Sequence, residues 1–86
     1  MTSHVFIVVG IVEYESFHVL RAFGTGAKAD AFVARLEAHA RKQPKLVGDD
    51  YDGHDMAIDR WRTRCPGGSV NAGYERYHAF QIPFYR

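Results

Sequence analysis

The densest group of potential ligands in the sequence is an acidic run at residues 49–55, DDYDGHD, which holds Asp49, Asp50, Asp52 and Asp55. Calcium loops place carboxylates at alternate positions around a glycine turn. This run departs from that pattern, because the twelfth position from Asp50 is Trp61 and because Gly53 comes too early. We therefore expect no metal site and a helix cap formed by the aspartates. A further hypothesis is that the carboxylates mimic phosphates and engage an arginine-rich partner.

Histidine and cysteine could carry nucleophilic chemistry, but their spacing does not indicate it. The five histidines lack the short spacings of metal and catalytic motifs. Cys65 falls on the apolar side of a predicted helix, which favours an inert packed thiol. The sequence GTG at residues 24–26 lacks the lysine and the glycine spacing of a phosphate loop, so it is interpreted as a capping turn. We expect no catalytic residue, no cofactor and no enzyme activity.

Arginines beside aromatic rings form a second group. Three arginines surround Trp61, and the C-terminal segment interleaves arginine and histidine with tyrosine and phenylalanine. This composition is typical of single-stranded nucleic-acid binding. On a helix, however, Arg60, Arg62 and Arg64 would point in different directions and Trp61 would join the core. The net charge of +1 also argues against a general attraction to nucleic acid.

The hydrophobic pattern predicts the elements that position these side chains. Residues 5–12, VFIVVGIV, are apolar at odd and even positions, which predicts a strand buried on both faces. A polar break at residues 13–16 and an apolar return at residues 17–23 predict an antiparallel hairpin. Thr25 is placed to cap a helix that ends near Lys42, before Pro44.

In the second half of the chain the residue pattern predicts a loop, a short helix and a last strand. After a loop at residues 45–53, helical spacing of apolar residues predicts a helix at about residues 54–64. Pro66 and two glycines end it, and residues 69–73 are expected to form a flexible turn. Residues 74–85 are expected to form an aromatic strand with Pro83 at its end or at a sheet edge.

This order of elements is typical of an α+β fold. We expect one domain over residues 1–86, a two-layer sandwich with two helices on one face of a three-stranded, mainly antiparallel sheet. Residues 5–12 are expected at its centre. The other face, which carries aromatic residues and arginines, then stays open in the monomer. A domain of this size buries only about 60% of its unfolded surface, so a partner surface is expected to supply the missing cover.

The composition also bears on where in the cell the protein is expected to act. A hydrophobic fraction of 47% predicts a folded domain rather than a disordered chain. The longest apolar run, residues 5–12, is far shorter than the roughly 20 residues that span a bilayer as a helix. The first four residues lack the features of a signal peptide, and the single cysteine excludes an internal disulfide. We expect a cytoplasmic protein with no membrane partner.

The pattern as a whole resembles a group of small uncharacterised accessory proteins encoded by tailed phages and prophages. The similarity covers most of the chain, although histidine is more usual where Cys65 stands. Small phage proteins often bind host machinery stoichiometrically, and inhibitors of host defence, anti-CRISPR proteins among them, share this size. The matching segments are the opening strand, the turn at residues 13–16, Gly24-Thr25-Gly26 with Ala31-Phe32, Trp61 to Cys65-Pro66, and Tyr77 to Ile82-Pro83-Phe84.

The resemblance implies a non-enzymatic phage or prophage protein in the bacterial host cell. It is expected to bind a host protein or complex, with a defence complex such as CRISPR–Cas as the target it inhibits. Three alternatives stay open. They are a homodimer through the open sheet face, a small nucleic-acid-binding module with an arginine and aromatic surface, and a small enzyme or metal protein whose site assembles from residues distant in the sequence. The predicted contact residues are Asp49, Asp50, Asp52 and Asp55 in the acidic loop and Tyr74, Arg76 and Tyr77 as anchors.

Overall fold

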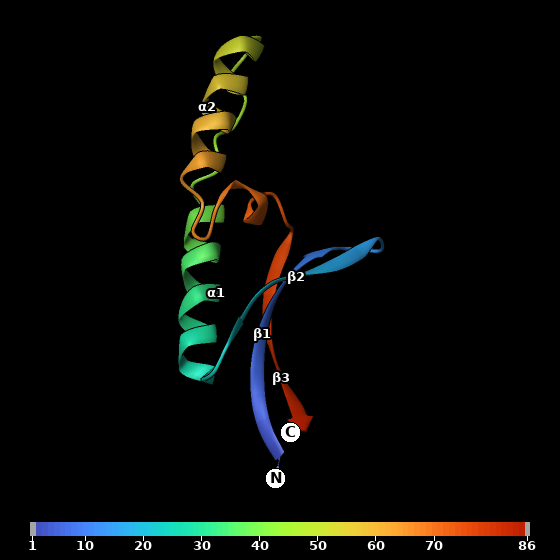
Figure 1. Ribbon diagram of the computed structural model, residues 1–86. Coiled ribbons are helices and arrows are strands. Elements are labelled where there is room, and N and C mark those ends of the chain that lie inside the picture. The colour runs from blue at the N-terminus through green and yellow to red at the C-terminus, as the bar shows by residue number, and fades with distance from the viewer. Residues whose placement is uncertain (1, 86) are drawn as a thin grey trace.

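The computed structural model describes residues 2–85 and contains a three-stranded antiparallel sheet and two α-helices (Figure 1). Met1 and Arg86 lie outside the described residues. The predicted α+β class and the order of its elements are confirmed. In chain order these elements are β1 (Thr2–Val12), β2 (Ser16–Phe23), α1 (Gly26–Ala40), α2 (Tyr51–Thr63), the short 3-10 helix η1 (Ser69–Asn71) and β3 (Arg76–Tyr85).

The sheet has the order β2-β1-β3, so the doubly apolar strand is central, as predicted. Both neighbours of β1 run antiparallel to it. Between Val8 and Val9 the pairing with β2 shifts by one residue, and this bulge leaves Leu20 without a partner on β1. Pro83 lies on the edge strand β3, where a missing backbone donor is tolerated.

Helix α1 forms the core with one face of the sheet. Thr25 caps it as predicted, because the side-chain oxygen accepts a hydrogen bond from the backbone N–H of Lys28 at 3.3 Å. Ala29, Phe32 and Leu36 follow helical spacing and are buried against the strands. The side of β1 that faces α1 is therefore buried in the core, and the other side of β1 faces away from the helix.

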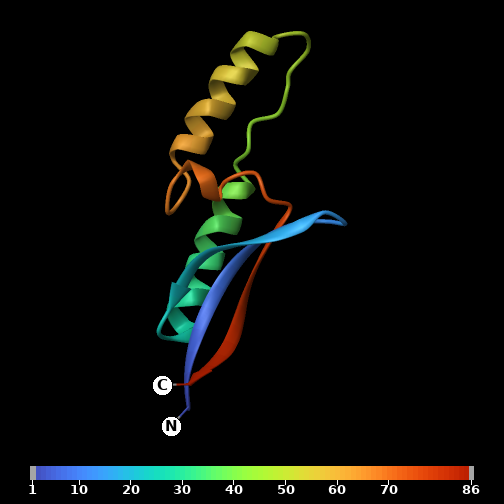
Figure 2. The ribbon, with the colours of Figure 1, turned by 45° about the vertical axis from the view of Figure 1, so that its right-hand side comes forward.

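Helix α2 begins at Tyr51 rather than near residue 54, because the Asp50 carboxylate accepts a hydrogen bond from the N–H of Gly53 at 3.1 Å. The helical cover over the strands comes from α1, whereas α2 continues past the end of the sheet and makes the molecule elongated, 58 × 25 × 16 Å (Figures 1 and 2). Trp61 is the one buried residue of α2. Within residues 2–85, neither helix has the length and apolar character needed to cross a membrane.

The segment before β3 is more ordered than predicted. Instead of a flexible turn, Ser69–Asn71 forms η1, and the buried Asn71 amide donates to the carbonyl of Pro66 at 3.1 Å. The backbone carbonyl of Asn71 accepts a hydrogen bond from the hydroxyl of Tyr77 at 2.7 Å. These two hydrogen bonds tie the turn to the end of α2 and to the last strand.

Candidate binding surface

The face of the sheet turned away from α1 is apolar and largely exposed. Side chains alternate along a strand, so the odd-numbered residues of β1 and their cross-strand partners share this side. Among the described residues, the large exposed side chains here are Phe17 (67% exposed), Val19 (59%), Phe80 (44%) and Ile82 (40%). We call this surface the open face. Its apolar residues are Val5, Ile7, Val9, Ile11, Phe17, Val19, Phe80 and Ile82, and the polar partners His78 and Arg76 lie on the same side.

The residue at the centre of the open face is already buried from solvent. Val9 is fully buried, although α1 lies on the other side of the sheet (Figure 2). Its cover comes from neighbours on the same face, including its β2 partner Val19. The neighbours themselves remain exposed, so a partner surface would remove large apolar side chains from water with little rearrangement.

A hollow of about 300 Å³ interrupts the open face near the hairpin turn. Phe17 of β2 and Phe80 of β3 contribute to its walls, and Val9 and Ile11 of β1 also line it. The remaining lining comes from the turn and the strand ends beside it, and it includes Glu15 and the fully exposed Tyr14. Apolar hollows of this kind hold the anchor side chains of protein interfaces.

Tyr14 also has an unusual backbone, with a φ of 63°. Left-handed backbone costs an L-residue roughly 1–2 kcal/mol, and a bulky side chain rarely adopts it. The turn holds this conformation with a hydrogen bond from the Glu15 N–H to the Val12 carbonyl at 3.1 Å. Strained residues cluster at functional sites, so this fully exposed aromatic residue is a candidate contact residue.

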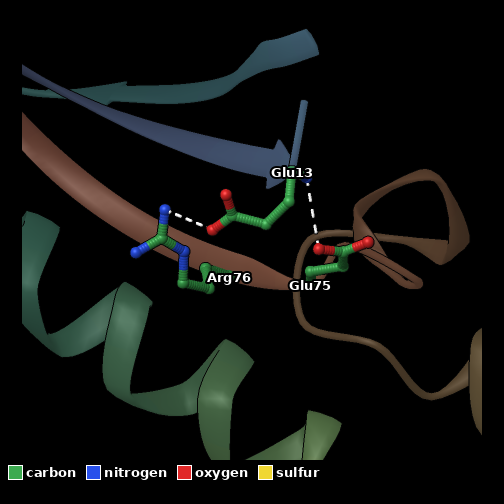
Figure 3. Close-up of polar contacts among 3 residues, drawn as sticks. All are labelled: Glu13, Glu75 and Arg76. Carbon is green, nitrogen blue, oxygen red and sulfur yellow. Dashed lines mark hydrogen bonds and ion pairs between the residues drawn. The ribbon is translucent and has the colours of Figure 1, made fainter. Parts of the chain in front are cut away.

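Charged groups lie beside the open face at the end of β1 (Figure 3). Arg76, one of the predicted anchors, is exposed and forms an ion pair with Glu13. The backbone N–H of Glu13 donates to the carboxylate of Glu75 at 3.2 Å. An exposed pair of this kind is worth well under 1 kcal/mol, so Arg76 remains available to a partner.

The other two predicted anchors lie on the opposite side of the sheet. The expectation that Tyr77 is exposed is wrong, because it pairs with Gly10 on the α1 side and is only 6% exposed. Burial, with a smaller effect from nearby Cys65, raises the pKa of Tyr77. Tyr74 is half-buried, and its ring lies over Gly10 so closely that a side chain there would overlap it.

The acidic residues lie far from the sheet, at the N-terminal end of α2 (Figure 1). Asp50 acts as the helix cap and Asp52 lies in the first turn. Asp49, Asp50, Asp52 and Asp55 are all exposed, but they do not share a surface with Tyr74 and Arg76. In the part of the chain described, no three histidine, cysteine or acidic side chains gather closely enough to hold a metal.

The arginines and the aromatic ring that suggest a nucleic-acid surface in the sequence do not form one surface in the structure. Trp61 is 6% exposed and its ring stacks on His39, so it offers no face for a base. Arg60 and Arg64 lie one turn apart and line a common cavity, whereas Arg62 lies beside Gly73. The expectation that the three arginines point in different directions therefore holds for Arg62. It is wrong for Arg60 and Arg64, whose side chains line the same cavity.

Cys65 is a buried free thiol, as predicted. Burial raises its pKa, which disfavours the thiolate that a nucleophile requires. Together with Trp61 it belongs to the buried hydrophobic cluster of the domain.

Neither the fold nor these surfaces can be assigned by similarity. Comparisons with protein-family models, with curated proteins and with solved structures find no match. The open face and the cavity beside Trp61 are therefore the features from which a function can be inferred.

Proposed function

We propose that this protein acts by stoichiometric binding to another protein, with the open face as its contact surface. The observation that carries the proposal is a row of large apolar side chains left in water on one side of the sheet, among them Phe17, Val19 and Phe80. Exposed apolar patches on small domains mark interaction sites, because covering them stabilises the complex by roughly 25 cal/mol per Å² of apolar surface.

The hollow specifies the chemistry of the partner. Its lining is mainly valine, isoleucine and phenylalanine, with Tyr14, Glu15 and Ser16 at the turn. It fits one large apolar side chain inserted between Phe17 and Phe80. The open face is mainly apolar, but Arg76 pairs with Ile11 on this side of the sheet and forms an ion pair with Glu13, so polar contacts are available beside the apolar side chains. The partner is therefore a protein that presents an apolar or aromatic anchor with polar groups around it.

A bacterial host protein is the proposed partner. The resemblance to accessory proteins of tailed phages and prophages supports this choice, and it makes a defence complex such as CRISPR–Cas the proposed target of inhibition. The contact surface rests on the geometry of the sheet, whereas the class of target rests on the resemblance.

Site-specific photocrosslinking tests the proposal. A benzophenone amino acid replaces Phe80 on the open face or, as a control, the exposed Tyr51 at the far end of α2. After irradiation in a bacterial lysate, position 80 should yield one dominant crosslinked protein that position 51 does not yield. Equal labelling from both positions, or none from position 80, would contradict the proposal. A crosslink from position 80 only to a second copy would assign the open face to a homodimer instead.

A further inference from the structure

A second cavity, of about 490 Å³, lies where the C-terminal ends of the two helices meet. His39 near the end of α1 contacts Trp61 in the last part of α2, so the ends of the helices are adjacent. The cavity is in the size range of small-molecule sites, about 300–1,000 Å³. Its lining consists of His39, Lys42, Pro44, Ala57, Arg60, Trp61 and Arg64, and it includes no carboxylate.

The charges around this cavity do not balance. Each helix C-terminus carries about half a negative charge, so two together supply about one. Lys42, Arg60 and Arg64 bring three positive charges, which leaves a surplus of about two. Within residues 2–85 the one ion pair joins Arg76 to Glu13 at the sheet, so none of the three cations has an acidic partner there. Compensation of the helix ends therefore accounts for only part of this positive charge.

The aromatic wall of the cavity is fixed in place. The Nε2 atom of His39 donates to the carbonyl of Trp61 at 2.6 Å, and the Trp61 Nε1–H donates to the carbonyl of His39 at 2.7 Å. The rings stack with centroids 4.5 Å apart. This rigid wall and the cations Lys42, Arg60 and Arg64 line the same cavity, so an anion held there would lie against a fixed surface.

We infer that this cavity binds the phosphate group of a small phosphorylated molecule. A phosphate monoester carries about 1.5 to 2 negative charges at neutral pH, which matches the surplus of positive charge. Arg60 and Arg64 can each donate two parallel hydrogen bonds to phosphate oxygens, and Lys42 adds a third cation. A nucleic-acid strand fits less well, because strand binding uses exposed rings and Trp61 is buried. The site is separate from the open face and does not depend on the function proposed for it.

Trp61 provides the readout, because it is the single tryptophan of the chain. The full-length protein is titrated with inorganic phosphate and, in a second arm, with adenosine monophosphate, while chloride keeps the ionic strength constant. We expect a saturable change in tryptophan fluorescence. Tighter binding of the nucleotide would identify a phosphate ester as the ligand, whereas equal binding would identify free phosphate, and either result supports a phosphate site.

Variants separate this site from a general charge effect. Arg60→Gln and Arg64→Gln should each weaken phosphate binding by about tenfold, since each loses a bidentate contact. Arg62→Gln is the matched control on the same helix, because Arg62 does not line the cavity, and it should bind as the wild type does. Circular dichroism checks folding, and Lys42→Gln, which lies outside both helices, supplies a variant less able to disturb α2.

Three results would overturn the inference. The first is no saturable response up to about 10 mM phosphate, which is weaker than a functional site requires. The second is equal weakening by Arg62→Gln and Arg60→Gln in folded proteins. The third is binding of oligonucleotides with an affinity that grows with strand length, which would assign the cavity to nucleic acid.

Discussion

His39 and Trp61 donate hydrogen bonds to each other's backbone carbonyl, at 2.6 and 2.7 Å, across the junction of α1 and α2. Both acceptors are carbonyls near helix ends, and each also accepts a backbone N–H from three residues further along the chain, from Lys42 and from Arg64. Because Trp61 is the one buried residue of α2, this pair is the principal attachment of that helix to the rest of the molecule. It also builds one wall of the basic cavity.

Trp61→Phe tests the importance of that attachment. The change keeps an aromatic ring but removes the indole N–H, so the carbonyl of His39 loses its side-chain donor. Because that carbonyl still accepts the N–H of Lys42, we expect the lost hydrogen bond to lower the free energy of unfolding in urea by about 0.5–1.5 kcal/mol. Met56→Ala on the same helix, at an exposed position, should change it by less than about 0.5 kcal/mol. Equal effects of the two substitutions would show that the pair does not hold α2.

Gly10→Ala tests the close approach of Tyr74 to the central strand. A methyl group at position 10 would overlap the Tyr74 ring, and overpacking of this kind costs about 1–3 kcal/mol. The loss should be measured by urea unfolding in the wild type and in a Tyr74→Ala background. In the second background it should be much smaller, because the overlapping ring is gone. An equal loss in both would mean that the glycine is needed for a reason other than Tyr74.

Tyr14→Gly should stabilise the free protein by about 1 kcal/mol, because glycine adopts a positive φ without steric cost. Thermal unfolding with Glu15→Gly as the control distinguishes relief at position 14 from a general effect of glycine in the turn. If Tyr14→Gly lowers the unfolding temperature as much as the control does, the residue is not strained.

The raised pKa of Tyr77 predicts that the protein loses stability at alkaline pH. Its folded pKa lies above the unfolded value of about 10, so its contribution is complete below pH 10 and is lost as the pH rises through the folded pKa. Urea unfolding at pH 8 and at about pH 11 measures this loss. Tyr77→Phe lacks the hydroxyl bonded to Asn71 and should be less stable at pH 8, but it should lose less between the two values. A slope identical to that of the wild type would contradict the burial effect.

The local features of this fold could be predicted from the sequence. The doubly apolar segment at residues 5–12 indicates a central strand because a solvated edge or face would need polar residues, and Thr25 indicates a helix start because its side chain reaches a free backbone N–H. Asp50 carries the same signal for α2, but the acidic residues after it obscure which one caps the helix.

The candidate surfaces depend on long-range register, which the sequence does not reveal. Tyr77 and Phe80 are both aromatic residues of β3, yet Tyr77 pairs with Gly10 on the buried side and Phe80 with Ile7 on the open side. A shift of one residue in this pairing would exchange their roles. The basic cavity is also nonlocal, because His39 and Trp61 are 22 residues apart and no motif links them.

The affinity of the partner crosslinked at position 80 for two valine variants tests the open face most directly. Val19→Asp places a charge on the open face, while Val70→Asp makes the same change at an exposed residue of η1. With both variants folded, we expect Val19→Asp to weaken binding by about 30-fold or more, as loss of an interface hot spot does, and Val70→Asp to bind as the wild type does. Unchanged affinity of Val19→Asp, or an equal loss in both variants, would contradict the assignment of the open face as the binding surface.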